Sequence, residues 1–135
     1  MNEMSPDTVI GVVGAGTMGN GIAEVAARAG YDVIMHDVRD EFLDRGLAAI
    51  DKSLQRDVDK DRLDGAGKQS IIARIRRTID FAAFREASFV VEAVVEDLGV
   101  KTQVFRMLDE VTPSHAILAS NTSSISITKL GAATK

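Results

Sequence analysis

The sequence predicts an α/β protein built on a doubly wound parallel sheet with helices on both faces. Short apolar segments alternate with segments of helical periodicity along most of the 135 residues, as in parallel sheets covered by crossover helices. A Gly-x-Gly-x-x-Gly motif lies between the first apolar segment and the first helical one. An aspartate ends the second apolar segment, eighteen residues after the motif.

The expected strands are residues 8–13, 31–37, 78–81, 87–95 and 116–120, and the expected helices are 17–29, 39–61, 68–77 and 100–111. Gly30 is expected to end the first helix, and residues 63–67 form a break. The strand order 3-2-1-4-5 follows from this alternation. Such a sheet normally has a sixth strand, so residues 1–135 are expected to form one domain that is truncated before its last strand.

Charge and composition exclude several classes of protein. Sixteen basic and twenty acidic residues give a net charge of −4, so no general attraction for nucleic acid or an anionic membrane is expected. The chain contains no cysteine, and we expect no metal site. The first residues lack a signal-peptide pattern, and no apolar run approaches the ~20 residues of a membrane span. The cytoplasm is the expected compartment.

The glycine motif predicts a dinucleotide site. Gly14 permits a tight turn out of the strand, Gly16 admits a pyrophosphate to the backbone, and Gly19 permits close packing of helix and strand. The free N–H groups at the start of the helix attract phosphate. The motif also includes Ala15, Thr17 and Met18. A simple glycine-rich turn is the competing interpretation, which the flanking strand and helix disfavour.

Asp37 ends the second predicted strand, where a carboxylate accepts hydrogen bonds from the adenosine ribose. A carboxylate would repel a 2′-phosphate at this position, so NAD is expected over NADP. Arg39 lies close by and would weaken this preference if it faced the ribose. An arginine at this place is more often a solvated helix-start residue.

Three segments together resemble the NAD-binding domain of the 3-hydroxyacyl-CoA dehydrogenases. They are GVVGAGTMGNGIAEVAARAGYDV, VVEAVVED followed by Lys101, and LASNTSSISIT. The resemblance extends from about Thr8 to the last residue. It implies an NAD-dependent enzyme that oxidises (3S)-3-hydroxyacyl-CoA to 3-oxoacyl-CoA. It also implies a C-terminal helical domain, absent from this chain, through which the family forms homodimers.

The same resemblance implies roles for individual residues. Glu96 and Lys101 match positions beside the nicotinamide end of the cofactor, and Ser123 matches a catalytic serine that contacts both cofactor and substrate oxygen. Ser53 and Lys60 match positions that hold the coenzyme A part of the substrate. Without the resemblance, Glu96 would be interpreted as a surface acid, Lys101 as a helix-start lysine, Ser123 as part of a capping turn, and Lys60 as part of a solvated charged face.

The family's general base is a histidine in a His-Phe-Phe-Asn-Pro segment, which this sequence does not contain. Its two histidines, His36 and His115, are expected to be partly exposed structural residues. The chain alone is therefore expected to be inactive. Two other functions stay open at this point: a stand-alone NAD-binding module without catalysis, and another dehydrogenase class with the same fold. The SNTSS segment argues against the latter.

Overall fold

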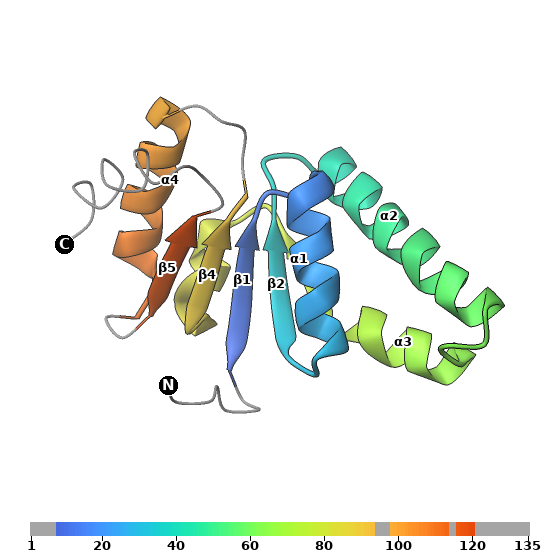
Figure 1. The fold of residues 1–135 in the computed structure, drawn as a ribbon. Coiled ribbons are helices and arrows are strands. Elements are labelled where there is room, and N and C mark those ends of the chain that lie inside the picture. Colours follow the sequence, from blue (N-terminus) through green and yellow to red (C-terminus); the bar gives the residue numbers. More distant parts are fainter. Residues whose placement is uncertain (1–7, 94–97, 114–115, 121–135) are drawn as a thin grey trace.

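The computed structural model describes residues 8–93, 98–113 and 116–120. These residues form a five-stranded parallel sheet in the order β3-β2-β1-β4-β5 (Figure 1), which confirms the predicted order. The strands are Val9–Val13 (β1), Asp32–His36 (β2), Ile75–Thr78 (β3), Phe89–Glu92 (β4) and Ile117–Ser120 (β5).

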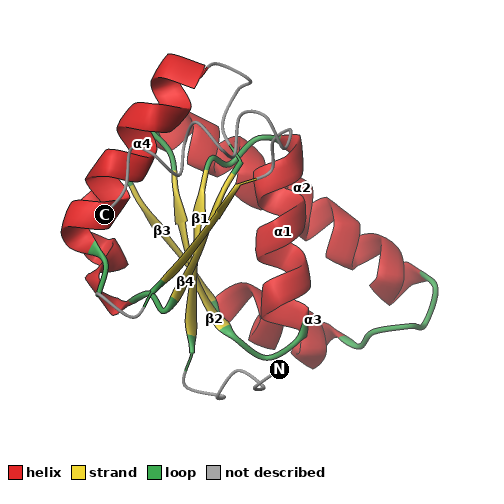
Figure 2. Ribbon diagram, turned by 60° about the vertical axis from the view of Figure 1, so that its left-hand side comes forward, coloured by secondary structure: helices red, strands yellow, loops and turns green. Residues whose placement is uncertain are grey.

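Helices cover both faces of the sheet. They are Thr17–Arg28 (α1), Asp40–Asp59 (α2), Gly65–Ala73 (α3) and Leu98–Val111 (α4), with a 3-10 helix at Phe81–Glu86 (η1). Figure 2 shows α1, α2 and α3 on one side of the strands and α4 on the other. None of the helices in the described ranges combines the length and apolar character that a membrane crossing requires.

Successive residues of the strands pack into two separate hydrophobic cores, one on each face of the sheet. Ile10 and Val12 of β1 pack with α1, α2 and α3, whereas Val13 packs with η1 and α4. Residues Val33 and Ile34 of β2 divide between the two cores in the same way. Because both faces are covered, the inner strands β1, β2 and β4 have apolar residues on both faces of the sheet.

The predicted boundary between the third helix and third strand is wrong. Helix α3 begins at Gly65, inside the predicted break, because the Asp64 carboxylate caps it by accepting the N–H of Gly67 at 2.6 Å. The helix ends at Ala73, and Ile75 already pairs with Val33 in the sheet. The third strand is therefore three residues earlier than predicted. Residues 94–95 of the predicted fourth strand lie outside the described residues.

Candidate functional site

The glycine loop between β1 and α1 is tied to the end of β2 by two backbone groups. Gly14 has a φ of 108°, which favours glycine, and its N–H donates to the His36 carbonyl at 2.8 Å. The N–H of Ala15 donates to Asp37 Oδ2 at 2.9 Å. The motif and the acid, 22 residues apart in sequence, thus form one unit at the carboxyl ends of neighbouring strands.

The other two glycines of the motif differ in what surrounds them. A Cβ on Gly19 would lie 1.7 Å from the Gly14 carbonyl oxygen, so the close contact of helix and loop requires glycine. A Cβ on Gly16 would meet nothing within 4 Å, so this glycine leaves open space above the loop. Gly16 is the N-cap residue of α1, so no side chain caps this helix. The first turn of α1 also carries no acidic residue. An anion can therefore reach the start of α1.

A cavity of about 350 Å³ adjoins this loop. Its lining comes from the carboxyl ends of β1, β2 and β4 and from the following helices: Gly14, Gly16, Asp37, Val38, Phe42, Ala93 and Val100. The polypeptide leaves β1 and β4 for opposite faces of the sheet, and open α/β sheets bind ligands at this switch point. Apart from Asp37 the lining side chains are apolar, which suits a flat ring system.

Arg39 is exposed and forms an ion pair with Glu41, also exposed, at 3.3 Å. Its guanidinium and that of Arg45 each lie 5.9 Å from the centre of the Phe42 ring, beside the cavity. Arg39 is the N-cap residue of α2, so its position is that of a solvated helix-start residue.

Lys101 lies in the first turn of α4, as a helix-start lysine does, but its side chain is buried. Its side chain is 1% exposed, and Nζ donates to Glu92 Oε2 at 2.8 Å and Oε1 at 2.9 Å. Glu92 is fully buried at the end of β4 and is not among the site residues predicted from the sequence. The available signal was an acid in an otherwise apolar strand. Glu96 and Ser123 lie outside the described residues.

Ser53 and Lys60 lie far from the cavity, near the other end of α2. Ser53 is about 20 Å along the helix from Asp40, at 1.5 Å per residue. Its hydroxyl donates to Glu24 Oε2 at 3.0 Å, and Lys60, the C-cap residue of α2, is exposed. The structure does not bring these two residues to the glycine loop, so only a long ligand can contact both places.

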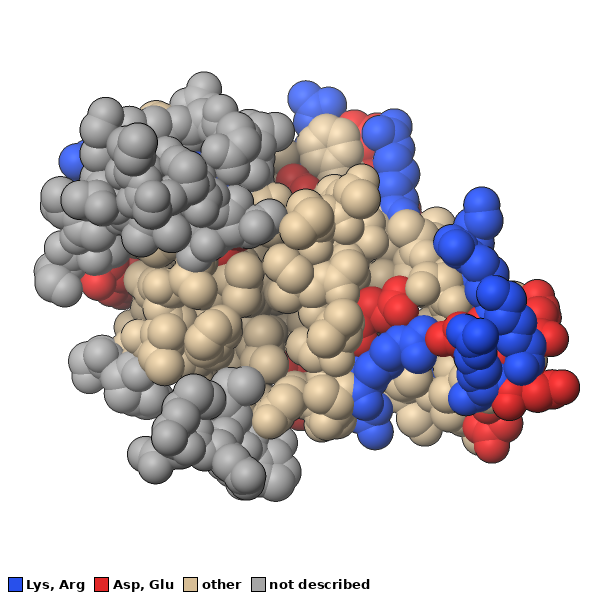
Figure 3. All heavy atoms as spheres, in the orientation of Figure 1, with Lys and Arg blue, Asp and Glu red and all other residues tan. Residues whose placement is uncertain are grey.

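Basic side chains gather over α2 in the space-filling view (Figure 3). The helix carries six acids, and each one bonds a partner elsewhere or a neighbour on the helix: Asp40, Glu41, Asp44, Asp51, Asp57 and Asp59. Its exposed bases share one face, at helical spacing, and lack an ion-pair partner among the described residues: Arg45, Lys52, Arg56 and the adjoining Lys60. Asp59 bonds only the neutral amide of Gln55 within the described ranges, so these four bases outnumber the one acid that no base neutralises there, and they give α2 a net positive face.

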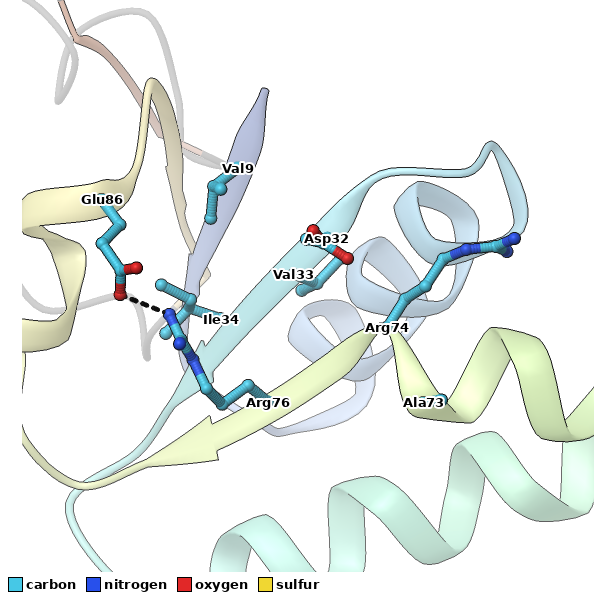
Figure 4. Close-up of a pocket in the computed structure, with 8 residues that line it drawn as sticks. All are labelled: Val9, Asp32, Val33, Ile34, Ala73, Arg74, Arg76 and Glu86. Atoms are coloured by element: carbon cyan, nitrogen blue, oxygen red, sulfur yellow. Dashed lines mark hydrogen bonds and ion pairs between the residues drawn. The ribbon is translucent and has the colours of Figure 1, made fainter. Parts of the chain in front are cut away.

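A second cavity, of about 240 Å³, lies at the opposite end of the strands, where β1 and β2 begin (Figure 4). Three of its four charged side chains have bonding partners. Arg76 pairs with Glu86 at 2.6 Å, and Arg74 donates to the Ala27 carbonyl at 2.8 Å. This cavity contains no glycine loop and no helix start, and we assign it no role.

His36 is buried, so the expectation of partial exposure is wrong for this histidine. It is 3% exposed and packs against the rings of Phe81 and Phe84, with centroids 4.2 and 5.9 Å away. Burial lowers the pKa of its imidazole, and the contact between Nε2 and the Ile79 carbonyl opposes this only in part. Nδ1 has no hydrogen-bond partner among the described residues. His115 lies outside them.

Comparison with known proteins identifies the ligand of the glycine loop. A sequence profile described as 3-hydroxyacyl-CoA dehydrogenase, NAD binding domain, matches residues 9–135. The chain belongs to this family. Its cofactor is NAD, and the open Gly16, the uncapped start of α1 and Asp37 fit a dinucleotide. The predicted family and cofactor are confirmed.

Relatives and solved structures agree with this assignment. A Deinococcus radiodurans protein, named as a probable 3-hydroxybutyryl-CoA dehydrogenase, is 47% identical over 123 residues, 91% of this chain and 44% of the relative. The structure of (S)-3-hydroxybutyryl-CoA dehydrogenase from Ralstonia eutropha matches with a TM-score of 0.91 and 41% identity, over 94% of this chain and 45% of that one. The 3-hydroxybutyryl-CoA dehydrogenase of Escherichia coli matches with a TM-score of 0.90 and 39% identity, over 95% and 27%. The chain therefore spans less than half the length of these proteins.

Proposed function

We propose that this domain provides the NAD site of an enzyme that oxidises (3S)-3-hydroxyacyl-CoA to 3-oxoacyl-CoA. The observation that carries the proposal is the unit of glycine loop and Asp37 beside a cavity, in a chain that matches the family from residue 9 to residue 135. NAD accepts the hydride from the substrate carbon when it is bound. The domain's own residues bind and orient the two reactants.

Each part of the site has a specific task in this proposal. The N–H groups at the start of α1 hold the pyrophosphate, together with the loop residues from Gly14 to Gly19. Asp37 accepts hydrogen bonds from the adenosine ribose. Glu96, Lys101 and Ser123 surround the nicotinamide end, in keeping with the resemblance of their segments to the family. Ser123 also donates a hydrogen bond to the substrate oxygen.

The positive face of α2 supports a coenzyme A substrate. Coenzyme A carries several phosphate charges, and the exposed bases from Arg45 to Lys60 complement them. Ser53 lies beside this face on the helix. A substrate with its phosphates near Lys60 and its hydroxyl near the nicotinamide would have to be long, as an acyl-CoA is.

The general base is proposed to lie outside this chain, because no His-Phe-Phe-Asn-Pro segment occurs in the sequence. The 135-residue chain alone is then expected to bind NAD without oxidising the substrate, since loss of a positioned base costs about 10²–10⁴-fold in rate. We also propose that the complete enzyme is a cytoplasmic homodimer, formed through a helical domain, without nucleic acid or membrane partners.

The test is hydroxyacyl-CoA-dependent formation of NADH by the complete protein, with Ser123→Ala and Ser124→Ala compared. Ser123→Ala should lower kcat by up to about 10²-fold with little change in NAD affinity, because its hydroxyl acts in the transition state. Ser124→Ala is the matched control and should keep its kcat. NAD binding without turnover by the complete protein would instead support a stand-alone NAD-binding module.

A further inference from the structure

Glu92 and Lys101 form a buried ion pair in the described part of the chain. Glu92 is the last residue of β4 and stands between Val13 of β1 and Ser120 of β5 in the sheet register. Lys101 lies in the first turn of α4, and its ammonium donates to both carboxylate oxygens, at 2.8 and 2.9 Å. The two side chains are 0% and 1% exposed.

Stability alone is a weak explanation for this pair. Burial removes both charges from water, and an apolar pair of similar volume often stabilises a fold equally well or better. Helix α4 also packs on the sheet through Val104 and Leu108, which are buried in one core with strand residues such as Val90. The reason for charges at this place therefore has to be sought in their surroundings.

The NAD cavity is next to the pair. Ala93 follows Glu92, Val100 precedes Lys101, and both line the cavity with Gly14, Gly16 and Asp37. Asp37 follows β2 and marks the adenosine side, while the glycine loop after β1 marks the pyrophosphate. The next strand in the sheet is β4. The nicotinamide half therefore extends toward the end of β4, where the pair lies.

We propose that Glu92 is a positioning residue for the nicotinamide half of NAD. Its carboxylate fixes the Lys101 ammonium and balances the positive charge of that ammonium beside the nicotinamide ring. The inference rests on the NAD site of the proposed function and is independent of the substrate. The nicotinamide ring is positively charged in NAD⁺ and neutral in NADH. A charge near the ring therefore changes the relative affinity for the two forms.

The expected size follows from Coulomb's law. One unit charge acting over roughly 10 Å at an effective dielectric constant of about 20 changes the NAD⁺ to NADH affinity ratio by roughly tenfold. Glu92→Gln removes a negative charge but keeps a carbonyl acceptor for Lys101, so it should favour NADH. Lys101→Met removes a positive charge with little loss of volume, so it should favour NAD⁺. The double variant removes both charges and should restore the ratio.

The experiment measures dissociation constants of NAD⁺, NADH and ADP-ribose for the wild-type protein and the three variants. ADP-ribose lacks the nicotinamide, so its affinity should change less than about twofold in each variant. Opposite shifts in the two single variants, cancelled in the double variant, are expected. Either single variant suffices if the other does not fold.

An unchanged NAD⁺ to NADH ratio in the single variants would overturn the inference. A parallel loss of NAD⁺, NADH and ADP-ribose binding would also overturn it, because it would show a purely structural role. Failure of the wild-type protein to oxidise hydroxyacyl-CoA would overturn only the proposed substrate, since the ratio is read from binding.

Discussion

Two substitutions in the same motif, Gly16→Ala and Gly19→Ala, should have opposite consequences. A Cβ on Gly19 would be 1.7 Å from the Gly14 oxygen and 2.6 Å from its carbonyl carbon, so loop and helix must separate. Overpacking of this kind costs about 1–3 kcal/mol or more. At about 3–5 °C per kcal/mol for a chain of this size, the melting temperature should fall by about 3–15 °C.

Gly16→Ala should leave the fold intact and weaken NAD binding. Gly16 has an ordinary φ of −69°, and its Cβ would meet no atom within 4 Å, so neither strain nor a clash is expected. The methyl group would occupy the space of the pyrophosphate. Loss of one charge-assisted hydrogen bond costs about 1.5–3 kcal/mol, which is roughly ten- to hundredfold in affinity.

The assay for this pair is a thermal melt without ligand and a calorimetric titration with NAD⁺. The expected result is loss of stability in Gly19→Ala and loss of NAD⁺ affinity at near wild-type stability in Gly16→Ala. Equal loss of stability in the two variants would refute it, as would normal NAD⁺ affinity in Gly16→Ala.

Three further predictions concern residues outside the glycine loop. Burial lowers the pKa of His36, so the folded state favours the neutral imidazole, and this contribution to stability is complete above about pH 6.5 and lost as the pH falls below it. The melting temperatures at pH 7.5 and pH 5.5 should therefore differ less in His36→Leu than in the wild type. An identical pH dependence in the two proteins would contradict this. Asp64→Ala removes the cap of α3 and should cost about 1 kcal/mol in a denaturant titration with NAD⁺ affinity unchanged, whereas an unaltered midpoint would show the cap to be dispensable. In the complete enzyme, Arg56→Ala and Lys60→Ala should each raise the KM for the acyl-CoA several-fold without changing kcat, and the increase should be larger at low salt than at high salt. A KM equal to that of the wild type would show that α2 does not bind the substrate.

The glycine loop and Asp37 were predictable because each requirement is local. A turn with positive φ at Gly14 and an approach that excludes a Cβ at Gly19 are backbone demands that only glycine meets. The strand before and the helix after the loop show their own periodicity. The contact of Asp37 with Ala15 then follows from the parallel pairing of β1 and β2.

Other features depend on contacts that periodicity does not show. Strand β3 reads Ile-Arg-Arg-Thr, and its arginines point to a loop or helix rather than a strand. It is an edge strand, and Arg77 pairs with Asp40 and Asp44 of α2, so charges are tolerated there. The Glu92–Lys101 pair joins the end of a strand to a helix start nine residues later, inside the protein. A single sequence does not distinguish such a pair from two surface charges.

The central claim is that the glycine loop and Asp37 form an NAD site, and the most direct measurement is a titration of the protein with NAD⁺ and NADP⁺. We predict saturable binding of NAD⁺ and at least about tenfold weaker binding of NADP⁺, because Asp37 would repel the 2′-phosphate. Asp37→Ser should narrow this difference. Equal affinity for the two cofactors, or no binding of NAD⁺, would contradict the account.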